Sequence, residues 1–200
     1  HTLTWPILRA IKERHGPVAL IHIDAHADIN DTMFGEKVAH GCPFRRAWED
    51  GCLINDKVFQ IGLRATGYAA DDFNWGRDKG WTVVQAEECW HKSLTPLMQI
   101  VRDRIGDAPV YLSYDIDSLD SAFAPGTGTV EPGGLTTWQA LELVRGCAGL
   151  NLVGGDLVEV SPPYDPTGNT ALIAANLLYE MLCVLPGVPQ NPSRFSGLTF

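Results

Sequence analysis

The chain has 200 residues and a net charge of −9, and 45% of its residues are hydrophobic and 20% charged, a balance typical of one globular domain. The acidic balance argues against nucleic-acid binding, which needs a basic surface, and no apolar run is long enough to cross a membrane. The five cysteines form no CxxC pair, so we expect free thiols and a cytoplasmic location.

Predicted strands and helices alternate along the chain. Apolar residues at helical spacing predict a first helix over residues 2–15. Strands are predicted at 18–24, 57–63, 81–85, 108–117 and 150–160, and further helices at 42–51, 93–105, 136–147 and 169–185. This alternation predicts an α/β fold of three layers, α/β/α, with a mainly parallel sheet of about five strands.

Potential metal ligands follow the first and fourth predicted strands. Asp24, His26 and Asp28 occupy alternate positions at one strand end, and Asp115 and Asp117 do so at the other. Alternate residues of an extended chain point to the same side, and ligands of parallel sheets bind at the carboxyl ends of the strands. Clustered carboxylates raise one another's pKa unless cations are bound. Carboxylates with some imidazole suit divalent ions such as manganese, and a pair of ions would activate a water molecule.

Several segments closely resemble the arginase/agmatinase ureohydrolase family, on its agmatinase and guanidinobutyrase branch. They are "HTLTWPILRA", "DAHADIND", "AHGCPFRRA", "SYDIDSLDSAFAPGTGT" and "DLVEVSPPYDPTGNTA". The resemblance implies a manganese enzyme with two Mn²⁺ per subunit. A hydroxide bridging the two ions would attack a guanidino compound and release urea and an amine. It also implies a homo-oligomer, a trimer or a hexamer.

The resemblance implies a role for each site residue. Six side chains resemble the family's metal ligands, in three pairs: His1 and Asp28 for one ion, His26 and Asp117 for the other, and Asp24 and Asp115 as bridges between them. His40 resembles the family's proton-shuttling histidine, and Glu159 the glutamate that pairs with the substrate guanidinium. The expected catalytic residues are therefore His40, Glu159 and Asp117. His22 lies further from the strand end, and we expect a core histidine there.

The loop before His40 is the expected contact for the far end of the substrate, with Asn30 and Met33 as substrate-binding candidates. Acidic residues of this loop, Asp31 and Glu36, lie nearer to the metal ligands in sequence than the basic residues of the next helix. We therefore expect agmatine, whose tail is a cation, to be converted to putrescine. The alternative substrate is 4-guanidinobutyrate or a related guanidino acid, whose tail is an anion.

The resemblance also sets expectations for the extent of the domain. We expect a partial ureohydrolase domain over residues 1–187, with N-terminal strands missing, and a loose tail over 188–200. The five strands should take the order 5-4-1-2-3, which leaves the fifth at an exposed edge. A truncated, non-catalytic remnant is an alternative of another class. A single-zinc deacetylase is a third, although it would not need both His1 and Asp28.

Overall fold

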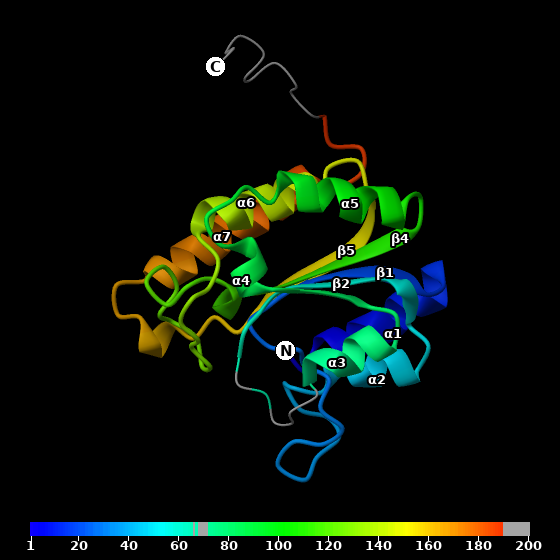
Figure 1. Ribbon diagram of the computed structural model, residues 1–200, viewed down its shortest axis with the longest axis horizontal. Helices are drawn as coiled ribbons and strands as arrows, with labels where there is room; N and C mark the ends of the chain where they lie inside the picture. Colours follow the sequence, from blue (N-terminus) through cyan, green and yellow to red (C-terminus); the bar gives the residue numbers. More distant parts are fainter. Residues whose placement is uncertain (66, 68–71, 190–200) are drawn as a thin grey trace.

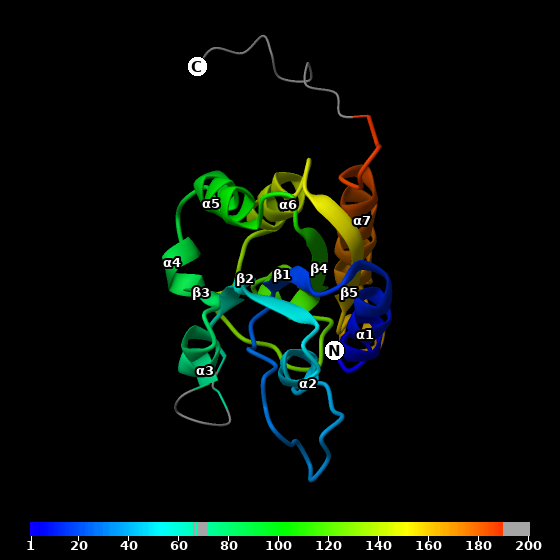
Figure 2. The same cartoon turned by 90° about the vertical axis from the view of Figure 1, so that its right-hand side faces the viewer.

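The computed structural model describes residues 1–65, 67 and 72–189. Its middle layer is a parallel sheet of five strands, with helices on both faces (Figures 1 and 2). The strands are β1 (Val18–Ile23), β2 (Leu53–Leu63), β3 (Thr82–Gln85), β4 (Pro109–Asp115) and β5 (Asn151–Val158). Their order, β3-β2-β1-β4-β5, confirms the predicted arrangement, read from the opposite edge.

The helices form the two outer layers. One face of the sheet is covered by α1 (Thr4–His15), α2 (Pro43–Glu49) and α3 (Asp72–Asp78), and the other by α4 (Ala86–Cys89), α5 (Thr95–Ile105), α6 (Thr137–Gly146) and α7 (Asn169–Cys183) (Figure 1). The sequence did not predict α3 and α4, because both are too short to show a helical period. Among the described residues, no helix combines the length and the hydropathy that a membrane span requires.

The central strand β1 connects the two cores. All six of its residues are buried, as its continuous apolar run predicted. Ile21 packs in the core beneath α5, α6 and α7, whereas Leu20 packs in the core beneath α1 and α2. Strands β2 and β4 flank it, so the residues at its carboxyl end lie in the middle of the sheet edge, where flanking elements can supply further ligands.

A row of buried polar side chains crosses the face of the sheet that α1 and α2 cover. We call it the polar row, and it consists of Gln60 of β2, His22 of β1, Ser113 of β4 and Asp156 of β5. Each is paired in register with the next across the sheet. Gln60 contacts His22, and Ser113 donates a hydrogen bond to Asp156. Buried polar groups need such partners, and the row lies directly beneath the carboxyl ends of β1 and β4.

Two glycines let helices approach both faces of the edge strand β5. A Cβ added to Gly154 would lie 2.7 Å from Ile11 Cδ1 of α1, and one added to Gly155 would lie 2.7 Å from the Leu112 carbonyl oxygen and 2.9 Å from Met181 Cε of α7. The clash at Gly155 is with a neighbouring strand's backbone, which cannot move as a flexible side chain can.

We therefore expect Gly155→Ala to destabilise the protein by about 1–3 kcal/mol through overpacking. The matched control is Gly128→Ala, since no atom lies within 4 Å of its added Cβ. Urea unfolding of both variants at one protein concentration provides the comparison. Equal stability of the two variants would mean that β4 and β5 can separate at this point at little cost.

Candidate metal centre

The segment that follows β1 turns instead of continuing as a strand. β1 ends at Ile23, and Asp28 has a left-handed backbone with φ of 52°. Asp24, His26 and Asp28 do come together, as predicted. The predicted cause, alternation along an extended chain, is wrong, because the chain turns after Ile23. Asp is among the residues that tolerate this backbone region best, and the turn folds Asp28 back toward Asp24.

The end of β4 is likewise not extended to the last predicted position. The strand ends at Asp115, and a 3₁₀ turn, Ile116–Ser118, carries Asp117. One oxygen of Asp115 accepts a hydrogen bond from the Asp117 backbone N–H at 2.9 Å. Thr129 Oγ1 donates a hydrogen bond of 3.1 Å to Asp117 Oδ2. The capped turn directs both carboxylates toward the end of β1.

His1, three residues before the start of α1, lies among three carboxylates. Its Nδ1 atom is 3.2 Å from Asp24 Oδ2, 3.1 Å from Asp28 Oδ2 and 3.2 Å from Asp115 Oδ2. This nitrogen is buried and has no hydrogen-bond partner, while Nε2 lies 2.7 Å from Ser113 Oγ of the polar row. A nitrogen surrounded by oxygens without a hydrogen bond suits a cation held between them.

His26 forms a second group on the other side of Asp24. Its Nδ1 atom is 3.0 Å from Asp117 Oδ2 and 3.4 Å from Asp24 Oδ1. Asp24 thus directs Oδ2 toward the His1 group and Oδ1 toward the His26 group. A carboxylate placed in this way has the geometry to join two neighbouring metal positions.

The electrostatics of the cluster are those of negative charges buried together. Burial raises the pKa of Asp115, and the charges of Asp117 and Asp24 raise it further. Burial and the charge of Asp24 also raise the pKa of Asp28 and of Asp117. Burial lowers the pKa of His26, but its contacts with Asp117 and Asp24 outweigh burial and raise that pKa to about 11. The cluster therefore attracts positive charge strongly.

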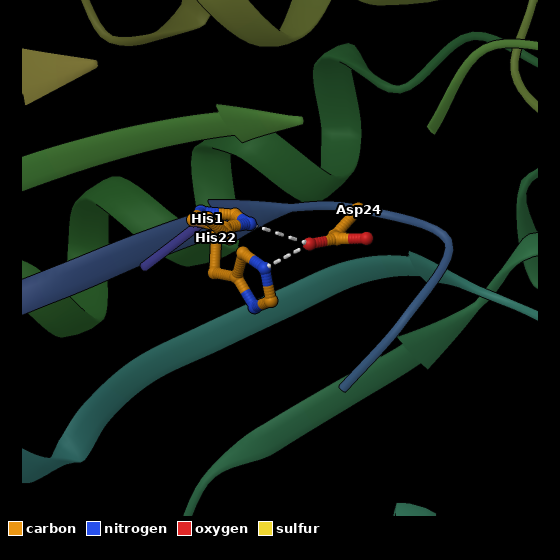
Figure 3. Close-up of side chains that lie close together, drawn as sticks. All are labelled: His1, His22 and Asp24. Carbon is orange, nitrogen blue, oxygen red and sulfur yellow. Dashed lines mark hydrogen bonds and ion pairs between the residues drawn. The ribbon is translucent and has the colours of Figure 1, made fainter. Parts of the chain in front are cut away.

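His22 also reaches Asp24, which the sequence interpretation missed. It is fully buried in β1, as expected of a core histidine, yet its Nε2 lies 2.6 Å from Asp24 Oδ2 (Figure 3). Figure 3 shows His1 and His22 approaching the same carboxylate oxygen. By position alone, His1, His22 and Asp24 could hold an ion. The signal in the sequence was the two-residue spacing between His22 and Asp24.

A cleft of about 240 Å³ opens from the cluster to the surface. All but two of the predicted site residues line it: His26, Asp28, Asn30, Met33, His40, Asp115, Asp117 and Glu159. The exceptions, His1 and Asp24, are buried, and His1 lies 3.1 Å from the cleft-lining Asp28. The cleft therefore brings the cluster of carboxylates and imidazoles, His40 and Glu159 to one space.

Glu159 directly follows β5 and has a left-handed backbone, with φ of 64°. Its side chain is half-buried, and Oε1 contacts the backbone nitrogen of His1. A non-glycine residue in this region is held there by its surroundings. The unusual backbone turns the carboxylate from the strand into the cleft.

The loop before His40 contributes less charge to the cleft than predicted. Asp31 is bound by Arg46 at 2.8 Å and lies 3.6 Å from Arg45, and none of these three lines the cleft. Instead, Asp72 at the start of α3 and Glu131 line it. Asp72 belongs to α3, a helix that the sequence did not predict. Glu131 belongs to a loop that is distant in sequence from the ligands and reaches the cleft only in the folded chain.

Arg64 holds in place the loop that contains Glu131. Its guanidinium donates hydrogen bonds to the backbone oxygens of residues at both ends of the loop, including Asp117 and Glu131, each at 2.7 Å. Burial lowers the pKa of Arg64, and the nearby acidic groups oppose this effect. The Arg64 side chain therefore links the backbone at Asp117, in the carboxylate cluster, to the backbone at Glu131, in the wall of the cleft.

The comparisons with known proteins agree with the fold. The arginase family model matches residues 1–183. A guanidinobutyrase of Pseudomonas aeruginosa is 70% identical over 96% of this chain and 60% of its own length, and a mitochondrial agmatinase of Gallus gallus is 60% identical over 94% and 55%. The solved proclavaminate amidino hydrolase of Streptomyces clavuligerus superposes with a TM-score of 0.87 at 41% identity, covering 91% of this chain and 60% of that one.

The chain thus spans between 55% and 60% of the length of these relatives. The family match extends over most of the chain, from the residue that places an imidazole in the cluster to the last residue of α7. The chain belongs to the arginase family.

Proposed function

We propose that this chain carries the catalytic centre of a metal-dependent hydrolase that cleaves a guanidino compound to urea and an amine, with agmatine as the substrate and putrescine as the product. The observation that carries the proposal is the joining of two imidazole–carboxylate groups through Asp24, one oxygen toward each. The relatives' names, guanidinobutyrase and agmatinase, support the same reaction class.

Two manganese ions fit the cluster by charge and by donor chemistry. Four carboxylates carry the charge that two divalent ions would balance, and the unpartnered Nδ1 of His1 needs a cation. His1 and Asp28 would hold one ion, His26 and Asp117 the other, with Asp24 and Asp115 shared. When bound, such ions lower the pKa of a water molecule so that it can act as a nucleophile at neutral pH.

The remaining steps fall to side chains that line the cleft. The Glu159 carboxylate would pair with the planar guanidinium and orient its carbon toward the cluster. Asp117 lies on the cleft side of the cluster, where it can accept a hydrogen bond from the attacking water. His40 lies outside the cluster, on the loop, and would carry a proton to the departing amine.

The walls of the cleft favour a cationic tail. Asp72 and Glu131 line it, and no Lys or Arg does so among the residues that the structure describes. Met33, Phe73 and Val130 supply apolar contacts for a short alkyl chain. An acidic wall would attract the ammonium of agmatine and repel a carboxylate.

4-Guanidinobutyrate is the second candidate substrate. Its support comes from the relatives, since one is named guanidinobutyrase and another, from Homo sapiens and 58% identical, is named guanidino acid hydrolase. A carboxylate tail would need a cationic partner from outside the described wall of the cleft.

The full-length protein is proposed to be a homo-oligomer, a trimer or a hexamer, in the cytoplasm.

Asp115→Asn tests the metal centre. We expect the full-length variant to lose most of its bound manganese, because a shared carboxylate would be replaced by a neutral amide. Metal per subunit, measured by elemental analysis after gel filtration, gives the result, with the unmodified protein expected to hold two ions. One zinc or no metal in the unmodified protein would instead favour the deacetylase or the non-catalytic remnant.

His40→Ala tests the proton transfer. The variant should keep its full metal content and lose turnover by about 10²-fold or more, the usual effect of removing a general acid. His15→Ala, at the exposed end of α1, is the matched control and should keep full turnover. Loss of metal together with turnover in the His40 variant would place His40 in the metal centre instead.

The sign of the substrate tail is tested by comparing kcat/KM for agmatine and 4-guanidinobutyrate on the full-length enzyme. We expect agmatine to be preferred by at least tenfold, about 1.4 kcal/mol, and Glu131→Gln to reduce this preference. Glu36→Gln, outside the cleft, is the control. A tenfold preference for 4-guanidinobutyrate would select the second candidate, and a preference for arginine would contradict both.

A further inference from the structure

His22 could be either a metal ligand or a support for one, and its second ring nitrogen distinguishes the two. Gln60 of the polar row places its amide Nε2 3.0 Å from His22 Nδ1 and 2.8 Å from the Ala27 carbonyl oxygen. A carbonyl can only accept, so the Gln60 group that faces it must be the amide nitrogen. The same nitrogen then donates its other hydrogen to His22 Nδ1.

This donation fixes the tautomer of His22. If Nδ1 accepts a hydrogen bond, it carries no proton, so the proton of the neutral ring is on Nε2. That atom lies 2.6 Å from Asp24 Oδ2 (Figure 3). To bind a metal, Nε2 would have to carry no proton. The hydrogen bond from Gln60 to Nδ1 places the proton of the ring on Nε2. His22 is therefore a hydrogen-bond donor to Asp24.

Both oxygens of Asp24 are then held by one protein hydrogen bond each. Oδ2 accepts from His22, and Oδ1 accepts from the backbone N–H of His26 at 2.7 Å. A carboxylate oxygen has room for two partners, so each oxygen keeps one lone pair. Oδ2 also lies 3.2 Å from His1 Nδ1 and Oδ1 lies 3.4 Å from His26 Nδ1, so one oxygen is near each group.

We propose that Gln60 and His22 form a positioning relay that locks the carboxylate plane of Asp24 across the two metal positions, and that His22 is not itself a ligand. The inference rests on the proposed metal-binding role of Asp24. The relay is built into the sheet, because Gln60 and His22 are register partners on β2 and β1. It is also rigid, since both side chains are buried and the His22 ring packs 4.0 Å from that of Phe44.

The experiment compares variants of the full-length, metal-depleted protein by calorimetric titration with MnCl₂. His22→Leu removes the donor and should weaken manganese binding by about 10–100-fold, the usual effect of losing a group that orients a ligand, while two ions still bind. His22→Gln places an amide N–H near the former Nε2 and should recover most of the affinity. Gln60→Met frees the tautomer and should cause a smaller loss.

Gln139→Leu is the matched control. Gln139 is also buried and donates from its amide to two carbonyl oxygens, those of Cys89 and Lys92, but far from the cluster. This variant should lose stability and keep its manganese affinity. If His22→Leu does not fold, Gln60→Met still decides, because it leaves the histidine in place.

Three results would overturn the relay. They are unchanged affinity in His22→Leu, unchanged affinity in Gln60→Met, and loss of one bound ion in both His22→Leu and His22→Gln, which would make His22 a ligand. Absence of manganese binding in the unmodified protein would instead overturn the proposed function on which the relay rests. The readout is binding, so none of these outcomes depends on having the right substrate.

Discussion

Carboxylates buried side by side cannot all keep their charge unless positive charge lies among them. Asp24, Asp28, Asp115 and Asp117 lie together at the middle of the sheet edge, with the imidazoles of His1 and His26 among them. Much of the surrounding architecture serves to hold these groups together. β1 and β4 are neighbours in the sheet, the turn after each brings its second carboxylate back, and α1 begins three residues after His1, at Thr4.

Two of the four non-glycine residues with a left-handed backbone in the described part of the chain, Asp28 and Glu159, line the cleft. Both have left-handed φ values, a conformation that Asp tolerates comparatively well and that is costly for Glu. The Asp28 side chain then lies 3.1 Å from His1 Nδ1, and Glu159 lines the cleft. Such turns aim a side chain into a cleft in a way that a regular strand cannot.

The sequence was most informative where burial dictated it. The apolar run of β1 predicted a central strand, and the order of all five strands followed once the family resemblance was added. Side-chain directions after the strands were less accessible, because Asp28 turns where an extended chain was expected. Asp72 and Glu131 could not be found, since they reach the cleft only through folding. The sequence placed Asp31 near the ligands only by its position along the chain; in the structure it pairs with Arg45 and Arg46 and does not line the cleft.

The loop between the cluster and His40 is closed at its base. The backbone and side-chain N–H groups of Asn30 both donate to the Gly41 carbonyl oxygen, at 2.9 and 3.0 Å, and an added Cβ at Gly41 would lie 2.6 Å from Met33 Cε. The tip is a tight turn with Phe34 86% exposed. Because the two ends of the loop are hydrogen-bonded to each other, changes within the loop have little effect on the residues that flank it. Each doubling of the loop length costs only about 0.6 kcal/mol in free energy of loop closure. This segment could therefore be exchanged between related enzymes as a cassette, altering what enters the cleft without displacing Asp28.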